Sequence, residues 1–207
     1  MKLSLLSLAI GTFALGIAEF TMMGILGDIA RDIQISIPSA GQLISAYAFG
    51  VSVGAPGLLL IRKMPLKRIM LILAAIITVG NALIAVSPDF HTMLVSRFIS
   101  GLPHGAFFGA GAIVCSRLSP GRGASAVAIM VGGMTVANII GVPAATYIAG
   151  VLSWRGTFAI VSLLGICTLS AILLWMPSLP SLPDTGLKGQ FRFLCHGGAW
   201  LIYAGVF

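Results

Sequence analysis

The chain has 207 residues, of which 58% are hydrophobic and only 8% are charged, and its mean hydropathy is +1.07. Soluble domains carry about 25% charged residues, so this composition excludes a soluble globular protein and indicates one that resides in the lipid bilayer. The net charge of +7 does not indicate nucleic-acid binding, because the few basic residues lie between apolar runs and form no stripe interleaved with aromatic side chains.

Apolar runs divide the chain into regular segments. A helix of about 20 apolar residues spans the hydrocarbon core of a membrane. Six such runs are expected to be transmembrane helices, in chain order residues 3–26, 41–61, 69–86, 93–114, 124–152 and 157–176. The first run is too long for a signal peptide and lacks an obvious cleavage site, so we interpret it as a transmembrane helix. The connections, such as residues 28–38, are short and carry charges and turn formers, which predicts one helical bundle.

The distribution of lysine and arginine predicts the orientation. With the N-terminus in the cytoplasm, nine of these residues lie on the inner side and two, Arg31 and Arg155, on the outer side, while Arg97 lies inside the fourth run. Cytoplasmic loops of membrane proteins carry an excess of positive side chains. We therefore predict a multi-pass protein of the cell inner (plasma) membrane with a cytoplasmic N-terminus.

The chain is expected to have three regions. Residues 1–176 form the six-helix bundle, residues 177–192 a cytoplasmic connection, and residues 193–207 the truncated start of a seventh helix. A helix of about 15 residues extends only about 22 Å, less than the roughly 30 Å of a hydrocarbon core. A segment that lies at the membrane interface is the alternative for this last region.

Small residues recur at four-residue spacing in three of the runs. The fifth run shows the pattern at Gly133, Ala137, Gly141, Ala145 and Ala149, and such stripes let helix backbones approach closely in lipid. Gly-Pro sequences interrupt the second run at residues 54–57 and the fifth at residues 141–143. If the bundle consists of two inverted three-helix repeats, the interruptions occupy corresponding positions, as is typical of transporters.

Two ionisable residues lie inside apolar runs, Glu19 in the first and Arg97 in the fourth. A charge there costs roughly 2.5–3.5 kcal/mol on insertion scales and by default marks a pathway, a relay or a partner. Helical spacing places each on a face with small or polar neighbours: Glu19 with Thr12, Gly16 and Met23, and Arg97 with Gly101, His104, Phe108, Gly111 and Cys115. We expect these faces to line a wet cavity in which Glu19 binds a proton and Arg97 is its partner.

Simpler roles are open for the same residues. Glu19 would snorkel to the outer end of its helix, Arg97 would anchor at the outer interface, and His104 would satisfy backbone groups freed by Pro103. The candidate residues of a substrate cavity, each with a packing hydrogen bond as the alternative, are His104, Tyr47, Asn138 and Gln42.

No chemistry of an enzyme is visible in the sequence. The cysteines Cys115, Cys167 and Cys195 show no metal or redox spacing, and there is no phosphate loop and no nucleophile paired with a base. We therefore expect neither catalysis, nor a metal, nor a cofactor.

Several segments carry a family pattern. They are residues 8–24 in the first run, 36–56 in the second, 97–109 (RFISGLPHGAFFG) in the fourth, 132–143 in the fifth and 154–158 at the start of the sixth. Together they resemble the major facilitator superfamily, and within it the AraJ-like efflux branch of sugar and drug exporters, over nearly the whole chain.

The resemblance implies two six-helix halves, alternating access and export of a small solute against proton import, with this chain supplying the N-terminal half. In proton-coupled members the arginine that matches Arg97 is implicated in proton transfer. The fifth-helix antiporter-like motif, here Gly133, Gly141 and Pro143, implies packing against the second half that limits leak. The gating loop after the second helix is matched by Gly57, Arg62, Lys63, Lys67 and Arg68, but its acidic residue is missing, so the resemblance does not extend to that residue's gating interaction.

The sequence therefore predicts an all-α membrane protein, the N-terminal bundle of a proton-coupled exporter of a sugar or drug-like solute. The expected partners are the lipid bilayer, the solute, protons, and either the missing C-terminal half or a second copy of the chain. Two alternatives stay open: a truncated, transport-inactive gene remnant, and a half-size membrane protein that acts only as a homodimer or interaction partner.

Overall fold

The computed structural model of the chain describes residues 2–181. The elements are α1 (Lys2–Asp32), α2 (Ile37–Ile61), α3 (Leu66–Val86), α4 (Phe90–Gly101), α5 (Pro103–Leu118), α6 (Gly123–Val136), the π-helical turn η1 (Ala137–Gly141), α7 (Val142–Val151) and α8 (Trp154–Trp175). This part of the chain contains no strand and six helical spans long and apolar enough to cross a membrane, which confirms the predicted fold class. The predicted seventh helix at residues 193–207 lies outside the described residues.

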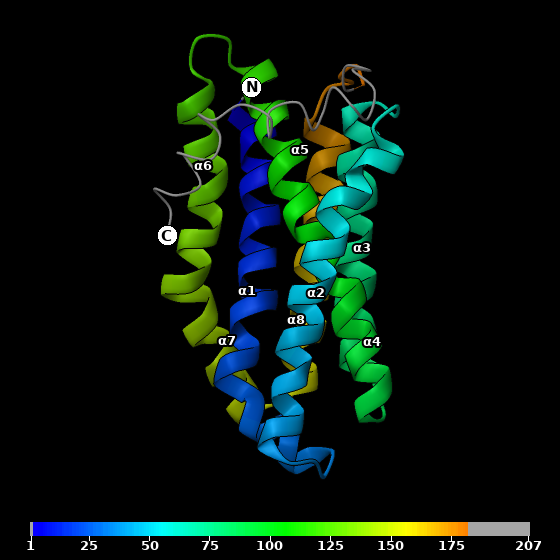
Figure 1. Cartoon of the computed structure of the whole chain (residues 1–207). Helices are drawn as coiled ribbons and strands as arrows, with labels where there is room; N and C mark the ends of the chain where they lie inside the picture. Colours follow the sequence, from blue (N-terminus) through cyan, green and yellow to red (C-terminus); the bar gives the residue numbers. More distant parts are fainter. Residues whose placement is uncertain (1, 182–207) are drawn as a thin grey trace, which may run out of the picture.

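The spans lie side by side as a bundle around α1 (Figure 1). α1 contacts α2, α6, α7 and α8, while α3 packs on α4 and α8, and α2 packs on α4 and α5. α1 is accordingly the most buried span and α2 the least buried. Glu19 thus lies on the central helix of the bundle.

The first predicted connection is shorter than expected, because α1 continues to Asp32 and includes Asp28 and Arg31. Arg31 lies in the last turn, where the helix dipole favours a cation, and pairs with Asp28 one turn earlier. Gln34 then takes a left-handed conformation (φ 55°) that stops the helix. Hydropathy correctly predicts where the apolar run ends, but it does not predict that the helix continues beyond that run to polar residues.

Prolines shape two of the spans. The fourth span is divided at Leu102, and Pro103 is the first residue of α5, a position that needs no backbone N–H. In the fifth span, η1 ends two residues before Pro143, which is the second residue of α7. The Val142 N–H bonds to the Ala137 carbonyl, which is one residue further back than in an α-helix. The two predicted Gly-Pro interruptions therefore differ, because α2 continues through Pro56 without a change of helix type.

The bundle has two apolar clusters along α1, one toward its N-terminal end and one toward its C-terminal end, here called inner and outer after the predicted orientation. The inner cluster includes Leu8 and Leu15, and the outer cluster includes Met22 and Ile25. The predicted small-residue stripe of the fifth span is buried, and a Cβ on Gly133 would lie 2.1 Å from the Ala9 carbonyl oxygen of α1. Close packing of the fifth span on α1 therefore requires glycine at that position.

Candidate functional site

Arg97 lies in α4 with no exposed surface. Its Nη1 donates a hydrogen bond to the Ala18 carbonyl of α1 (2.8 Å), and its Nε donates to the Leu43 carbonyl of α2 (3.3 Å). The planar guanidinium fork reaches both acceptors at once, which a lysine ammonium does not do in the same geometry. Arg97 therefore joins three spans inside the bundle.

Tyr47 and His104 continue from Arg97. The buried Tyr47 ring lies under the guanidinium, with 4.4 Å from Arg97 Cζ to the ring centroid. The Tyr47 hydroxyl hydrogen bonds to Nδ1 of His104 (2.9 Å), and the His104 ring stacks on Phe108 one turn later, with centroids 5.3 Å apart. His104 follows Pro103 directly, so the break between α4 and α5 sets where the ring lies.

Glu19 completes the cluster from the side of α1. Its Oε2 lies 3.7 Å from Nε2 of His104, and a third of its side chain (33%) is exposed. Among the described residues, the ion pairs include none between Glu19 and Arg97, and Glu19 Oε2 and Arg97 Nη2 are buried atoms without a hydrogen-bond partner. His104 and Tyr47 lie between the two charges and connect them through side-chain contacts.

The predicted cavity faces are mainly packing surfaces. Gly101 lies against the Tyr47 backbone, Gly111 lies against Met130, and the Cys115 thiol donates to the Ala126 carbonyl. The face of the fourth span is therefore divided between α2 and α6, and its middle, around His104, faces the buried Oε2 of Glu19. The reason is that α5 crosses both neighbours within its length, which periodicity alone does not reveal.

The remaining predicted residues are scattered over the bundle. Gln42 and Asn138 are exposed, on α2 and η1. Gly133 and Gly141 pack on α1, whereas Pro143 is exposed. The predicted gating loop lies at the turn between α2 and α3, which Arg62 and Lys63 begin. A Cβ on Gly57 would meet no neighbouring atom within 4 Å, Lys67 Nζ donates to the Leu173 carbonyl (2.9 Å), and Arg68 is exposed.

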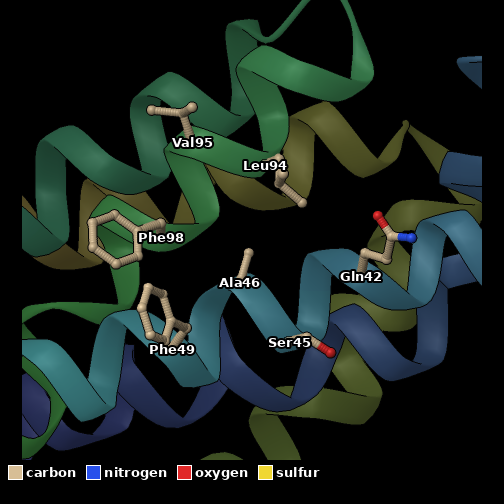
Figure 2. A pocket seen from close by; sticks show the side chains of 7 residues that line it. All are labelled: Gln42, Ser45, Ala46, Phe49, Leu94, Val95 and Phe98. Carbon is tan, nitrogen blue, oxygen red and sulfur yellow. The ribbon is translucent and has the colours of Figure 1, made fainter.

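A groove between α2 and α4 adjoins this site. It has a volume of about 530 Å³ and is lined by Gln42, Ser45, Ala46, Phe49, Leu94, Val95 and Phe98. Figure 2 shows the Phe49 and Phe98 rings facing each other at one end of the groove and Gln42 at the other. Gln42, predicted as a cavity residue, thus lines an apolar groove beside the buried cluster.

The sequence interpretation missed a polar cluster at the end of the bundle where α1 ends. It is formed by Asp32, Ser87, Trp154 and Arg155 and is here called the outer clasp, after the predicted orientation. Asp32 accepts hydrogen bonds from Trp154 Nε1 (3.0 Å) and from Arg155. Arg155 also donates to the Ser87 carbonyl (3.2 Å) and lies over the Trp154 ring. The clasp joins the ends of α1, α3 and α8, and the Trp-Arg pair was the only signal for it in the sequence.

Comparison with known proteins extends over nearly the whole chain. The model of the Major Facilitator Superfamily matches residues 8–207. AraJ of Escherichia coli K12 is 46% identical over 206 residues, which cover 99% of this chain and 52% of AraJ. The inner membrane transport protein YdhP of Escherichia coli K12 is 47% identical over 175 residues, which cover 84% of this chain and 45% of YdhP.

More distant proteins agree with this pattern. A Helicobacter acinonychis protein named "Probable sugar efflux transporter" is 34% identical over 177 residues, covering 84% of this chain and 45% of its own length. A crystal structure of a POT family transporter in complex with a thioalcohol-conjugated peptide has the same fold, with a TM-score of 0.74 at 15% identity over 98% of this chain and 45% of that one. The chain spans about half the length of the curated relatives it matches. The six-span bundle and the match over residues 8–207 show that the chain belongs to the Major Facilitator Superfamily.

Proposed function

We propose that the chain forms one bundle of a proton-coupled exporter in the inner membrane, with its N-terminus in the cytoplasm, and that Glu19 binds the coupling proton. The observation that carries the proposal is the chain of four side chains Glu19, His104, Tyr47 and Arg97, which come from three different spans and meet in the middle of the bundle. Ionisable groups at this depth are costly in lipid, so a transport role is their default interpretation.

Proton binding changes the interactions that Glu19 needs. An ionised carboxylate in a low-dielectric site requires a compensating donor or cation, whereas a neutral carboxyl group requires much less. His104 Nε2, at 3.7 Å, is the group that faces the carboxylate, and the exposed third of the Glu19 side chain gives protons access to it. Protonation of Glu19 would therefore release the attraction between α1 and α5.

Tyr47 determines how this change is transmitted. When the Tyr47 hydroxyl donates to Nδ1 of His104, the ring carries its proton on Nε2 and presents it to Glu19. The same tyrosine ring supports Arg97, which is bonded to backbone carbonyls of α1 and α2. A change of charge at Glu19 thus acts on α1, α2 and the fourth span together. Alternating access requires such a group of helices, which responds to proton binding as one unit.

The solute and the second bundle are part of the proposal. The Helicobacter acinonychis relative is named as a sugar exporter, and we propose a small polar or amphipathic solute of this kind. The exposed amides of Gln42 and Asn138 are suited to hydrogen bonds with hydroxyl groups. The relatives are about twice as long as this chain, so we propose that a second six-helix bundle completes the binding site.

The test is solute flux driven by a proton gradient in vesicles. It uses the chain alone and a chimera in which residues 1–176 replace the matching half of YdhP, each with Glu19→Gln or with the control Asp89→Asn. We expect the chimera to transport, Glu19→Gln to lose at least 90% of the proton-driven flux, about tenfold or 1.4 kcal/mol, and Asp89→Asn to retain it. Flux that Glu19→Gln leaves unchanged would contradict the proposal.

A further inference from the structure

The polypeptide does not leave the bundle where α8 ends. α8 stops at Trp175, and residues 177–181, here called the inner strap, continue across the end of the bundle that also holds the N-terminus (Figure 1, orange). Met176 is fully buried, and Leu179 packs on the inner apolar cluster. Pro177 and Pro180 exclude a helix here and leave the carbonyl groups of the strap free to accept hydrogen bonds.

Two helices supply donors to these carbonyls. The Leu66 N–H, at the first residue of α3, donates to the Leu179 carbonyl (3.2 Å). α3 has no side-chain cap at Pro65, so the inner strap satisfies one of the backbone N–H groups that every helix N-terminus leaves unpaired. Arg117, in the last turn of α5, donates to the carbonyls of Pro180 (2.6 Å) and Ser181 (3.1 Å).

The last turn of α8 is fixed in the same way. The Ser4 hydroxyl of α1 donates to the Trp175 carbonyl (2.7 Å), and Lys67 Nζ of α3 donates to the Leu173 carbonyl (2.9 Å). The last turn of α8 and the inner strap are therefore bonded to α1, α3 and α5. Of these helices, α1 carries Glu19 and α5 carries His104. Arg117 is the only one of these donors that holds the strap at its far end, beside Ser181.

We propose that the inner strap is an anchored segment held by Arg117, so that the chain as far as Ser181 is fixed at the end of α5. A pull on the following chain would then act on α5, the helix that carries His104. This coupling step rests on the proposed function, whereas the anchoring does not. Arg117 is a positioning residue in this scheme, since it acts through the strap and α5.

The anchoring is tested by the reactivity of a cysteine at position 181. Ser181→Cys is introduced into the full chain with Cys115, Cys167 and Cys195 replaced by serine, and its rate of maleimide labelling is measured in detergent. We expect Arg117→Gln to raise the rate by roughly three- to tenfold, because two charge-assisted hydrogen bonds are lost. Arg117→Lys, which keeps the charge and one donor, is expected to give an intermediate rate with unchanged thermal unfolding.

Arg122→Gln is the matched control, because Arg122 is exposed at the same end of the bundle and its substitution removes the same charge. It is expected to leave the labelling rate unchanged. Equal rates in Arg117→Gln and the parent protein, or equal acceleration by Arg122→Gln, would overturn the anchoring. In a YdhP chimera extended to residues 1–181 of this chain, so that it contains the inner strap, Arg117→Gln is expected to reduce transport severalfold more than Arg122→Gln. Faster labelling with unchanged transport would overturn the coupling alone.

Discussion

Gly54 and Gly57 lie one turn apart on α2, and only the first faces a neighbouring backbone. A Cβ on Gly54 would lie 1.8 Å from the Leu102 carbonyl oxygen, whereas a Cβ on Gly57 would meet no atom within 4 Å. Leu102 lies between α4 and α5, and its carbonyl oxygen is part of the backbone, so it cannot turn aside like the end of a flexible side chain. Gly54→Ala therefore forces α2 and the fourth span apart by more than 1 Å.

Both substitutions gain helix propensity, and only Gly54→Ala also introduces a steric clash. Alanine in a helix is favoured over glycine by about 1 kcal/mol. Overpacking costs typically 1–3 kcal/mol, and a clash with backbone belongs to the upper end, about 3 kcal/mol. We expect Gly54→Ala to lower the free energy of unfolding by about 2 kcal/mol and Gly57→Ala to raise it by up to about 1 kcal/mol.

The assay is reversible unfolding in mixed detergent micelles, followed by the helical circular dichroism signal. Tyr47 is on α2 and Arg97 is on α4, so Gly54→Ala is also expected to weaken their contact and to reduce transport by the chimera. Equal stabilities of the two variants would refute the reasoning, because they would show that α2 and the fourth span do not approach as closely as the structure has them.

The remaining predictions concern α1, the fourth span and the outer clasp. Gly133→Ala is expected to destabilise the bundle by about 1–3 kcal/mol, because its Cβ would lie 2.1 Å from the Ala9 carbonyl, while Gly132→Ala, with nothing within 4 Å, is expected to be tolerated in the same unfolding assay. The Thr92 and His91 N–H groups hold the pKa of the Asp89 carboxyl below its usual range. The stabilisation from Asp89 is therefore present above the unfolded-state pKa and lost as pH falls through the lower folded-state pKa. Unfolding measured against pH should show this acid loss in the parent protein and not in Asp89→Asn. Arg155→Lys is expected to cost about 1 kcal/mol or less, since both charges of the clasp are partly exposed, and a loss above about 3 kcal/mol would contradict this view of it.

The spans were predictable because the hydropathy of about 20 consecutive residues indicates a transmembrane helix without knowledge of its neighbours in the fold. The sequence placed six spans in chain order. Pro103 and Pro143 marked the two positions near which a regular α-helix is interrupted, by a break at Leu102 and by the π-helical turn η1. The extension of α1 to Asp32 was not predictable in the same way, because its last turns lie beyond the apolar run.

The sequence was sufficient to predict which residues form the candidate site, but not which of them contact one another. Cost in lipid singles out Glu19 and Arg97, and helical spacing adds His104. The contact of His104 with Tyr47 joins residues 57 positions apart, and it depends on how far α2 and α5 slide along each other. Glycines such as Gly54 and Gly101 set that register through backbone contacts, which no single-helix pattern encodes.

The inner strap was missed for a related reason. Residues 177–181 have the composition of a loop, and the sequence interpretation placed them in a cytoplasmic connection. Their fixed position depends on Leu66 and Arg117, which lie more than 60 residues away. Acceptors on backbone carbonyls carry no signal in residue type, so contacts of this kind become visible only in the folded chain.

The proposal for which the test is most direct is that proton binding at Glu19 changes the interactions of His104 and, through Tyr47, those of Arg97. Glu19 is the only glutamate in the sequence, so carboxyl-labelled glutamate gives a single nuclear magnetic resonance signal from this site. Together with ring-labelled histidine, assigned by His104→Gln, that signal can be followed against pH in lipid nanodiscs.

We predict that the Glu19 carboxyl signal and the His104 ring signal change over the same pH interval, as coupled groups do, and that Tyr47→Phe alters the His104 response while Glu19 still titrates. A His104 signal that stays constant while Glu19 gains its proton would contradict the account.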